Sequence, residues 1–154
     1  MPVTEVIVQE EDFDIGKLTE QVRCHDGSCG AVVTFTGIVR ELEQSDSSLT
    51  SLFLEHYPGM TEKALNKIIE KARAKWPLGN TVVYHRVGEL NLNDNIVFVG
   101  VASAHRVAAF EAAQFIMDYL KRDAPFWKKE VTPSGESWVE QKQSDLDSAE
   151  KWSN

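Results

Sequence analysis

The sequence predicts a single α+β domain that spans residues 1–154. Its length is that of one domain, and no internal repeat or linker divides it. Runs of β-branched residues alternate with segments whose apolar residues recur at helical spacing. A hydrophobic fraction of 42% and a charged fraction of 26% are ordinary for a globular protein. We expect no membrane span, because no apolar run reaches about 18 residues, and no signal peptide, so the cytoplasm is the expected location.

The first third of the chain predicts three strands, one helix and one loop. Strands are expected at residues 3–8, 31–39 and 52–57, the second of them rich in β-branched and aromatic residues. Residues 14–25 carry apolar side chains at helical spacing. The polar, serine-rich segment 41–51 is expected to be a mobile loop, and its length suggests a functional role.

The middle of the chain predicts a helix followed by two strands. Thr61 is a suitable N-cap for a helix that runs to Trp76, before Pro77 and Gly79. The strands are expected at residues 82–87 and 96–102, with residues 88–94 as their connection.

The last third predicts a long helix, two short strands and a tail. Ser103 is expected to open the helix, which ends before Pro125 and has a narrow polar stripe. Strands are expected at residues 126–131 and 137–140. The remaining segment, 143–154, is a polar tail in which a short helix can form.

The charge balance argues against binding to nucleic acid. The net charge is −8 and the pI is about 5.0, whereas nucleic-acid-binding proteins are usually basic. An acidic protein can still hold a local basic pocket, so the positions of the cations matter more than their number. Three basic clusters stand out, and we expect them to converge on a small anion.

The first cluster is His105 and Arg106, at the predicted start of the long helix. Free backbone N–H groups and the positive end of the helix dipole favour an anion there. The alternative is an exposed arginine and a packed histidine without a ligand.

The second cluster comprises Lys121 and Arg122 in the last helical turn, and Lys128 and Lys129 in the following strand. Cations suit a helix C-terminus without any function. Successive strand residues point to opposite faces, so one of the two later lysines must face inward. Desolvation would lower the pKa of that lysine and make it usable as a base or nucleophile, unless its stem reaches water.

The third cluster is Arg40, where a strand runs into the serine-rich segment; an ordinary surface arginine is the alternative. Elsewhere the sequence lacks P-loop, GxGxxG, GxSxG and HExxH motifs. Cys24 and Cys29 are too few for a zinc site, and no base motif lies near them, so we expect two reduced thiols rather than a metal site or a thiol enzyme.

Several long runs in the same order resemble the molybdopterin synthase catalytic (large) subunit family. They are Leu54–Met60 (LEHYPGM), Ser103–Arg106 (SAHR) and Met117–Glu130 (MDYLKRDAPFWKKE). The segments Ala31–Arg40 and Ile96–Val101 agree with it. The resemblance covers about Val3 to Trp152.

This resemblance implies an α/β-hammerhead with an additional antiparallel β-sheet, and a homodimer. Each large subunit would bind one small ubiquitin-like sulfur-carrier subunit, which gives a heterotetramer. The carrier's C-terminal Gly-Gly tail, activated as a thiocarboxylate, would donate sulfur twice to cyclic pyranopterin monophosphate and form the dithiolene of molybdopterin. No metal and no other cofactor is implied.

The resemblance also assigns roles to residues. Lys121 and Lys128 would be catalytic and contact the substrate. The further substrate-binding residues would be Ile38, Val39, Arg40, His105, Arg106, Lys129 and Glu130. Two positions depart from the family pattern: Ile38 stands where a lysine is frequent, and Lys142, which we consider a further anion contact, stands where an arginine is common.

The sequence is also consistent with a second hypothesis, in which the chain is not an enzyme. The chain could be a non-catalytic anion-binding or assembly module that uses the apolar helix 104–122 for oligomerisation. A requirement for Lys121 in turnover distinguishes the two, because a binding module needs no single lysine for chemistry.

Overall fold

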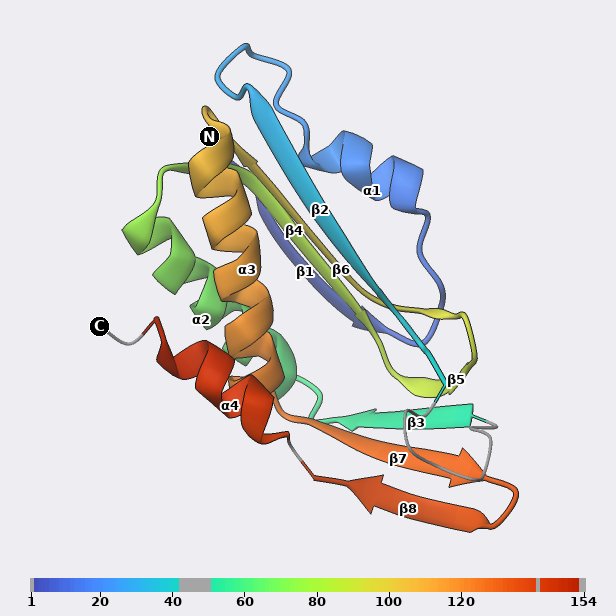
Figure 1. Cartoon of the computed structure of the whole chain (residues 1–154). Helices are drawn as coiled ribbons and strands as arrows, with labels where there is room; N and C mark the ends of the chain where they lie inside the picture. Colours follow the sequence, from blue (N-terminus) through green and yellow to red (C-terminus); the bar gives the residue numbers. More distant parts are fainter. Residues whose placement is uncertain (1, 42–50, 141, 153–154) are drawn as a thin grey trace.

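The computed structural model describes residues 2–41, 51–140 and 142–152 (Figure 1). Within these residues the chain forms four helices and two four-stranded sheets. The α+β class and the additional antiparallel sheet are thereby confirmed. Residues 42–50, most of the expected loop, lie outside the described residues, and Ser51 already belongs to a strand.

The first sheet has the strand order β1-β4-β6-β2. It consists of β1 (Thr4–Gln9), β4 (Leu78–Arg86), β6 (Asn95–Ser103) and β2 (Ala31–Ile38). β1 runs parallel to β4, whereas the β4–β6 and β6–β2 pairs are antiparallel. All four strands were predicted, although β4 begins four residues earlier than expected.

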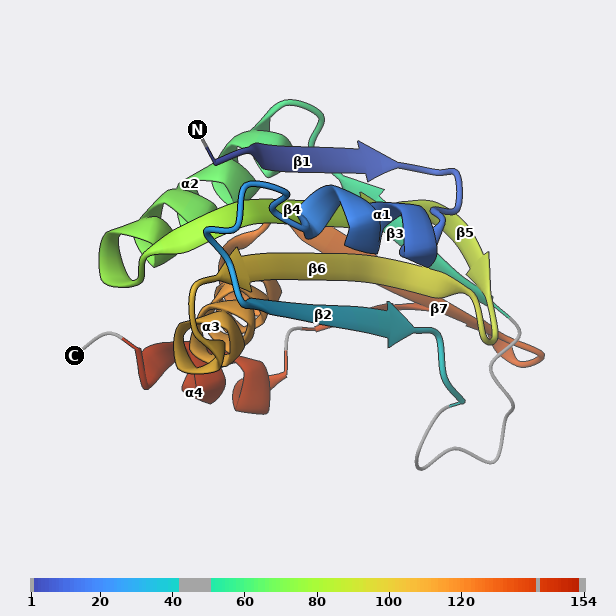
Figure 2. The same cartoon turned by 90° about the horizontal axis from the view of Figure 1, so that it is seen from above.

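Helices cover both faces of this sheet (Figures 1 and 2). α2 (Met60–Lys75) and α3 (Arg106–Asp123) lie on one face, and α1 (Ile15–Val22) lies on the other. Neighbouring residues of β4 divide accordingly: Val82 packs with the α1 side, and Val83 packs with α2 and α3. The larger core contains the buried side chains of Leu65, Ile69, Val99, Phe115 and Ile116.

The second sheet is fully antiparallel, with the order β5-β3-β7-β8. Its strands are β5 (Gly88–Asn91), β3 (Ser51–His56), β7 (Phe126–Thr132) and β8 (Gly135–Val139). β5 corrects our expectation of a plain connection at residues 88–94. The four residues of β5 are too few to show a sequence period, and pairing with β3 alone makes them a strand.

Two helices begin at positions other than those predicted. Thr61 is not the N-cap of α2, because its hydroxyl donates to the Pro125 carbonyl at 3.1 Å and is fully buried. Gly59 occupies the N-cap position with φ +85°, a conformation that glycine adopts without strain. The Gly59 N–H donates to Glu62 Oε1 at 3.1 Å.

Ser103 is the last residue of β6 rather than the N-cap of α3. Its buried hydroxyl donates to the Pro77 carbonyl at 3.0 Å. His105 is the N-cap, and the helix starts at Arg106. Similarly, α1 ends at Val22, three residues before the expected end at His25.

The C-terminal segment folds back onto α3. Its short helix, α4 (Gln143–Glu150), confirms the helix expected in the polar tail. Ala149 is fully buried, and the indole N–H of Trp152 donates to Asp118 Oδ2 at 2.7 Å. The Trp152 ring also packs edge-on against Trp76 and Phe115.

A stacked pair of rings joins the two sheets. His85 of β4 lies parallel to Phe126 of β7, with ring centroids 3.8 Å apart and an interplanar angle of 18°. The His85 Nδ1 lies 2.8 Å from the Arg86 carbonyl, which can only accept, so Nδ1 carries the proton. Burial lowers the pKa of His85 to about 4, and the charges of Lys121 and His56 act in the same direction.

We predict that His85 makes the fold sensitive to acid. Between pH 6.5 and 4 the unfolded chain binds a proton that the folded chain excludes, so stability falls as the pH falls through this range. The loss should be about 3 kcal/mol, at about 1.4 kcal/mol for each pKa unit of difference. Urea unfolding of the wild type and of His85→Gln between pH 7.5 and 4 measures it.

The variant should be less stable at pH 7.5 but have a flatter pH dependence. His25→Gln, at an exposed site, serves as the control and should keep the wild-type slope. Parallel pH curves for wild type and His85→Gln would contradict the assignment.

Candidate active site

Two lysines frame the candidate site where α3 passes into β7. Lys121 is exposed in the last turn of α3. Lys128 lies on β7, paired with Leu54 of β3 on one side and Val139 of β8 on the other. Lys128 is partly buried, so it is the inward-facing lysine that the strand alternation predicted.

The environment of Lys128 is partly buried and contains other lysines. Burial lowers the pKa of its amine, and the nearby positive charges of Lys121 and Lys142 lower it further. The carboxylates of Glu130 and Asp145 oppose this effect. The structure therefore brings four residues predicted from the sequence, Lys121, Lys128, Glu130 and Lys142, within electrostatic reach of one another.

Two histidines that sequence reasoning did not propose adjoin these lysines. His56 pairs with Phe126 across β3 and β7, and His85 stacks on the same ring. The side chains of Lys121 and His56 are both close enough to His85 for their charges to lower its pKa. His56 lies within the Leu54–Met60 run of the resemblance, but no local pattern links it to His85.

Lys129 points to the opposite face of β7. Its ammonium pairs with Glu136 at 3.3 Å and lies over the rings of Phe53 and Trp138. A substrate contact by Lys129 would require this pair to open.

The segment from Ile38 to Arg40 lies beside the second sheet. Val39 is buried in a cluster with Leu54 and Leu90, and its N–H donates to the Asp94 carbonyl at 2.9 Å. Its own carbonyl accepts from the Asn93 N–H at 2.8 Å, so Val39 anchors the segment through both backbone groups. Ile38 and Arg40 are exposed on either side of this anchor.

The structure does not bring His105 and Arg106 to the two lysines of the same chain. They lie at the start of α3, and fifteen residues separate Arg106 from Lys121 along the helix. At about 1.5 Å per residue, the separation is roughly 22 Å. Convergence of all three basic clusters on one anion is therefore wrong for a single chain.

Cys24 and Cys29 are free thiols at the far end of the first sheet. The side chain of His25, which follows Cys24 in the sequence, pairs with Glu20 at 3.2 Å. Among the described residues, no group of three or more His, Cys, Asp or Glu side chains is placed to hold a metal ion. The absence of a resident cofactor stays a prediction.

No helix within residues 2–41, 51–140 and 142–152 is both long and apolar enough to cross a membrane. The cytoplasmic location expected above stays a prediction.

Comparisons with known proteins identify the family of the chain. The model of the MoaE protein family matches residues 8–123. The molybdopterin synthase catalytic subunit of Escherichia coli K12 is 55% identical over 152 residues, which cover 99% of this chain and all of the relative. A molybdopterin biosynthesis MoaE protein from Burkholderia ambifaria superposes with a TM-score of 0.83 at 41% identity and covers 99% of both chains.

A more distant structure has the same fold. It is a complex of subunits 1 and 2 of the molybdopterin-converting factor from Helicobacter pylori, with a TM-score of 0.70 at 19% identity; the match covers 90% of this chain and 91% of that one. The extent of the family match and the 55% identity over nearly the whole chain decide the assignment. The chain therefore belongs to the MoaE protein family, the molybdopterin synthase catalytic subunits, which are enzymes of molybdenum cofactor biosynthesis.

Proposed function

We propose that this protein transfers sulfur from the C-terminal thiocarboxylate of a small ubiquitin-like carrier subunit to cyclic pyranopterin monophosphate. The product is the dithiolene of molybdopterin, and the carrier rather than a cofactor supplies the sulfur. The observation that carries the proposal is the partly buried Lys128 with Lys121 and Lys142 around it. Family membership favours this catalytic interpretation over a non-catalytic assembly module.

The charge distribution suits this chemistry. A substrate phosphate and a thiocarboxylate are both anionic, whereas the protein as a whole carries a net charge of −8. Clustered cations attract these groups locally, and they stabilise the negative charge that develops during attack and ring opening. The same cations repel one another without an anion, so binding relieves an unfavourable interaction.

The two lysines would have different roles in the reaction. Burial disfavours the charged form of Lys128, so its amine can accept a proton at a pH where an ordinary lysine stays protonated. Lys121 is exposed in the last turn of α3 and would meet the carrier's terminal carbonyl. The carboxylate of Glu130, on the same face of β7 as Lys128, favours the protonated amine and so raises the pKa of Lys128.

A second copy of the chain would complete the site. His105 and Arg106 lie roughly 22 Å from Lys121 of their own chain, which is too far for one small substrate. Next to them α3 exposes Val107 and Phe110 by 61% and 62%, and the edge strand β2 exposes Phe35 by 43%. We propose that this apolar surface forms the homodimer contact, and that it carries His105 and Arg106 to the partner's lysines.

Replacement of the lysines should separate chemistry from binding. Lys121→Ala and Lys128→Ala should each lower the rate of dithiolene formation on the order of 10²–10⁴-fold, the usual contribution of a proton-transfer group. Carrier binding and the oligomeric state should remain. The measurement is product formation with purified thiocarboxylated carrier, with Lys67→Ala on the exposed face of α2 as the matched control.

Lys128→Arg tests the proton-acceptor role itself, since an arginine keeps the charge but does not give up its proton. We expect this variant to be as impaired as Lys128→Ala. Wild-type activity in Lys128→Arg, or in both alanine variants, would overturn the assignment.

Mixing two inactive variants tests whether a site is shared between chains. In a mixed dimer of Lys121→Ala and Arg106→Ala, one of the two shared sites keeps both wild-type residues. Coexpression at equal amounts should therefore restore about a quarter of wild-type activity, because about half of the dimers are mixed and each has one intact site. If the groups act within one chain, the mixture stays as inactive as its components.

A further inference from the structure

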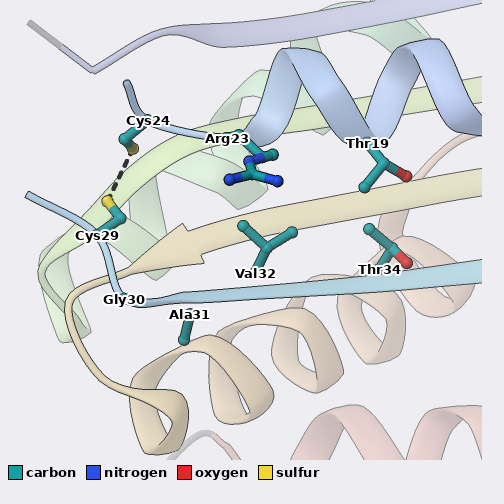
Figure 3. A pocket seen from close by; sticks show the side chains of 8 residues that line it. All are labelled: Thr19, Arg23, Cys24, Cys29, Gly30, Ala31, Val32 and Thr34. Atoms are coloured by element: carbon teal, nitrogen blue, oxygen red, sulfur yellow. Dashed lines mark hydrogen bonds between the residues drawn. The ribbon is translucent and has the colours of Figure 1, made fainter. Parts of the chain in front are cut away.

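Cys24 and Cys29 form an isolated pair that the proposed sulfur transfer does not use. They are the two cysteines of the chain, and they flank the turn between α1 and β2. Their sulfur atoms lie 2.8 Å apart and point toward each other (Figure 3). A disulfide bond is about 2.05 Å long, so a small side-chain movement would join them.

The surrounding residues hold both sulfur atoms in place. A Cβ atom added to Gly79 of β4 would lie 2.5 Å from Cys29 Sγ and 2.9 Å from Cys24 Sγ. Both sulfur atoms therefore occupy the space that a side chain at position 79 would need. Between the cysteines, Asp26 Oδ1 accepts from the Ser28 N–H at 2.9 Å, and Gly27 has φ +82°. This turn brings residues 24 and 29 together before any bond forms.

A pocket gives small molecules access to the pair. It has a volume of about 360 Å³ between α1 and β2, and both cysteines line it together with Arg23, Thr19 and Thr34 (Figure 3). The exposed Arg23 side chain lies along the same pocket. A guanidinium beside two thiols favours an anionic reaction partner.

We propose that Cys24 and Cys29 are a reversible redox pair that an anionic low-molecular-weight disulfide, such as glutathione disulfide, converts to an intramolecular disulfide. One cysteine, as the thiolate, attacks a sulfur of glutathione disulfide, which releases the first glutathione thiolate and leaves a mixed disulfide. The other cysteine loses its proton and attacks the protein sulfur of that mixed disulfide. The second glutathione leaves, so one dithiol and one glutathione disulfide give one protein disulfide and two glutathione thiols.

The disulfide would fix the segment that precedes α3. The Gly30 N–H, next to Cys29, donates to the carbonyls of Ser103 and Ala104 at 3.1 and 3.2 Å. A Cβ atom at Gly30 would lie 2.9 Å from the Ala104 oxygen, so the two segments are in close contact. Closing the loop from Cys24 to Cys29 therefore restricts the backbone directly before His105.

The test equilibrates the reduced full-length protein with glutathione buffers of increasing oxidised fraction, without oxygen and with a chelator. Intact mass and alkylation of free thiols follow the reaction. We expect both thiols to disappear together, with a mass loss of two hydrogens. The product should contain a disulfide within one chain, which dithiothreitol reduces. Cys24→Ser and Cys29→Ser should instead stop at a mixed disulfide with one glutathione.

Arg23→Ala tests the anion preference of the pocket. It should slow oxidation by glutathione disulfide several-fold but leave oxidation by the neutral hydroxyethyl disulfide unchanged. In the oxidised wild type, amide exchange at Gly30 should slow, and the melting temperature should rise by about 4–8 °C, as a short closed loop predicts.

Three results would overturn the proposal. They are free thiols that persist in fully oxidised glutathione, a mixed disulfide that accumulates in the wild type, and disulfides that link two chains on a non-reducing gel. If Arg23→Ala slows oxidation by glutathione disulfide and by hydroxyethyl disulfide equally, the preference for an anionic partner is wrong.

Discussion

The stack of His85 on Phe126 is the contact on which the site depends, because it fixes where the two sheets meet. Phe126 directly follows Pro125, so the same contact fixes the passage from α3 into β7. The Thr61 hydroxyl donates to the Pro125 carbonyl, which ties the start of α2 to this point. Lys128 follows Phe126 by two residues, so both side chains point to the same face of β7 and Lys128 is drawn inward.

The stack of His85 on Phe126 also affects the charge of the candidate site. His85 must stay neutral to be buried, and a neutral ring adds no further positive charge near Lys121, Lys128 and Lys142. Among the groups that affect Lys128, Lys121 and Lys142 lower its pKa, and the carboxylates of Glu130 and Asp145 raise it. In the proposed function, these lysines would attract an anionic substrate locally although the chain carries a net charge of −8.

Local patterns were sufficient for most of the fold and failed where a distant partner decides. The strands of the first sheet, and the expectation that one of Lys128 and Lys129 faces inward, follow from local sequence patterns. Thr61 and Ser103 have the residue types of N-caps, but their hydroxyls donate to the carbonyls of Pro125 and Pro77, which lie 64 and 26 residues away. No local rule contains such contacts, and the same holds for the meeting of His56 and His85 at Phe126.

The wrong expectation that His105 and Arg106 meet the lysines of the same chain has a different cause, because the predicted helix length already excludes it. The predicted helix from Ser103 to Pro125 has a fixed rise per residue, and its two ends therefore lie more than 20 Å apart, at about 1.5 Å per residue. A straight helix cannot bring Arg106 to Lys121 in any arrangement of the remaining elements. The length of α3 thus keeps Arg106 far from Lys121 of the same chain, and the exposed apolar side chains of Val107 and Phe110 lie at the Arg106 end of the helix, where the proposed second chain would pack.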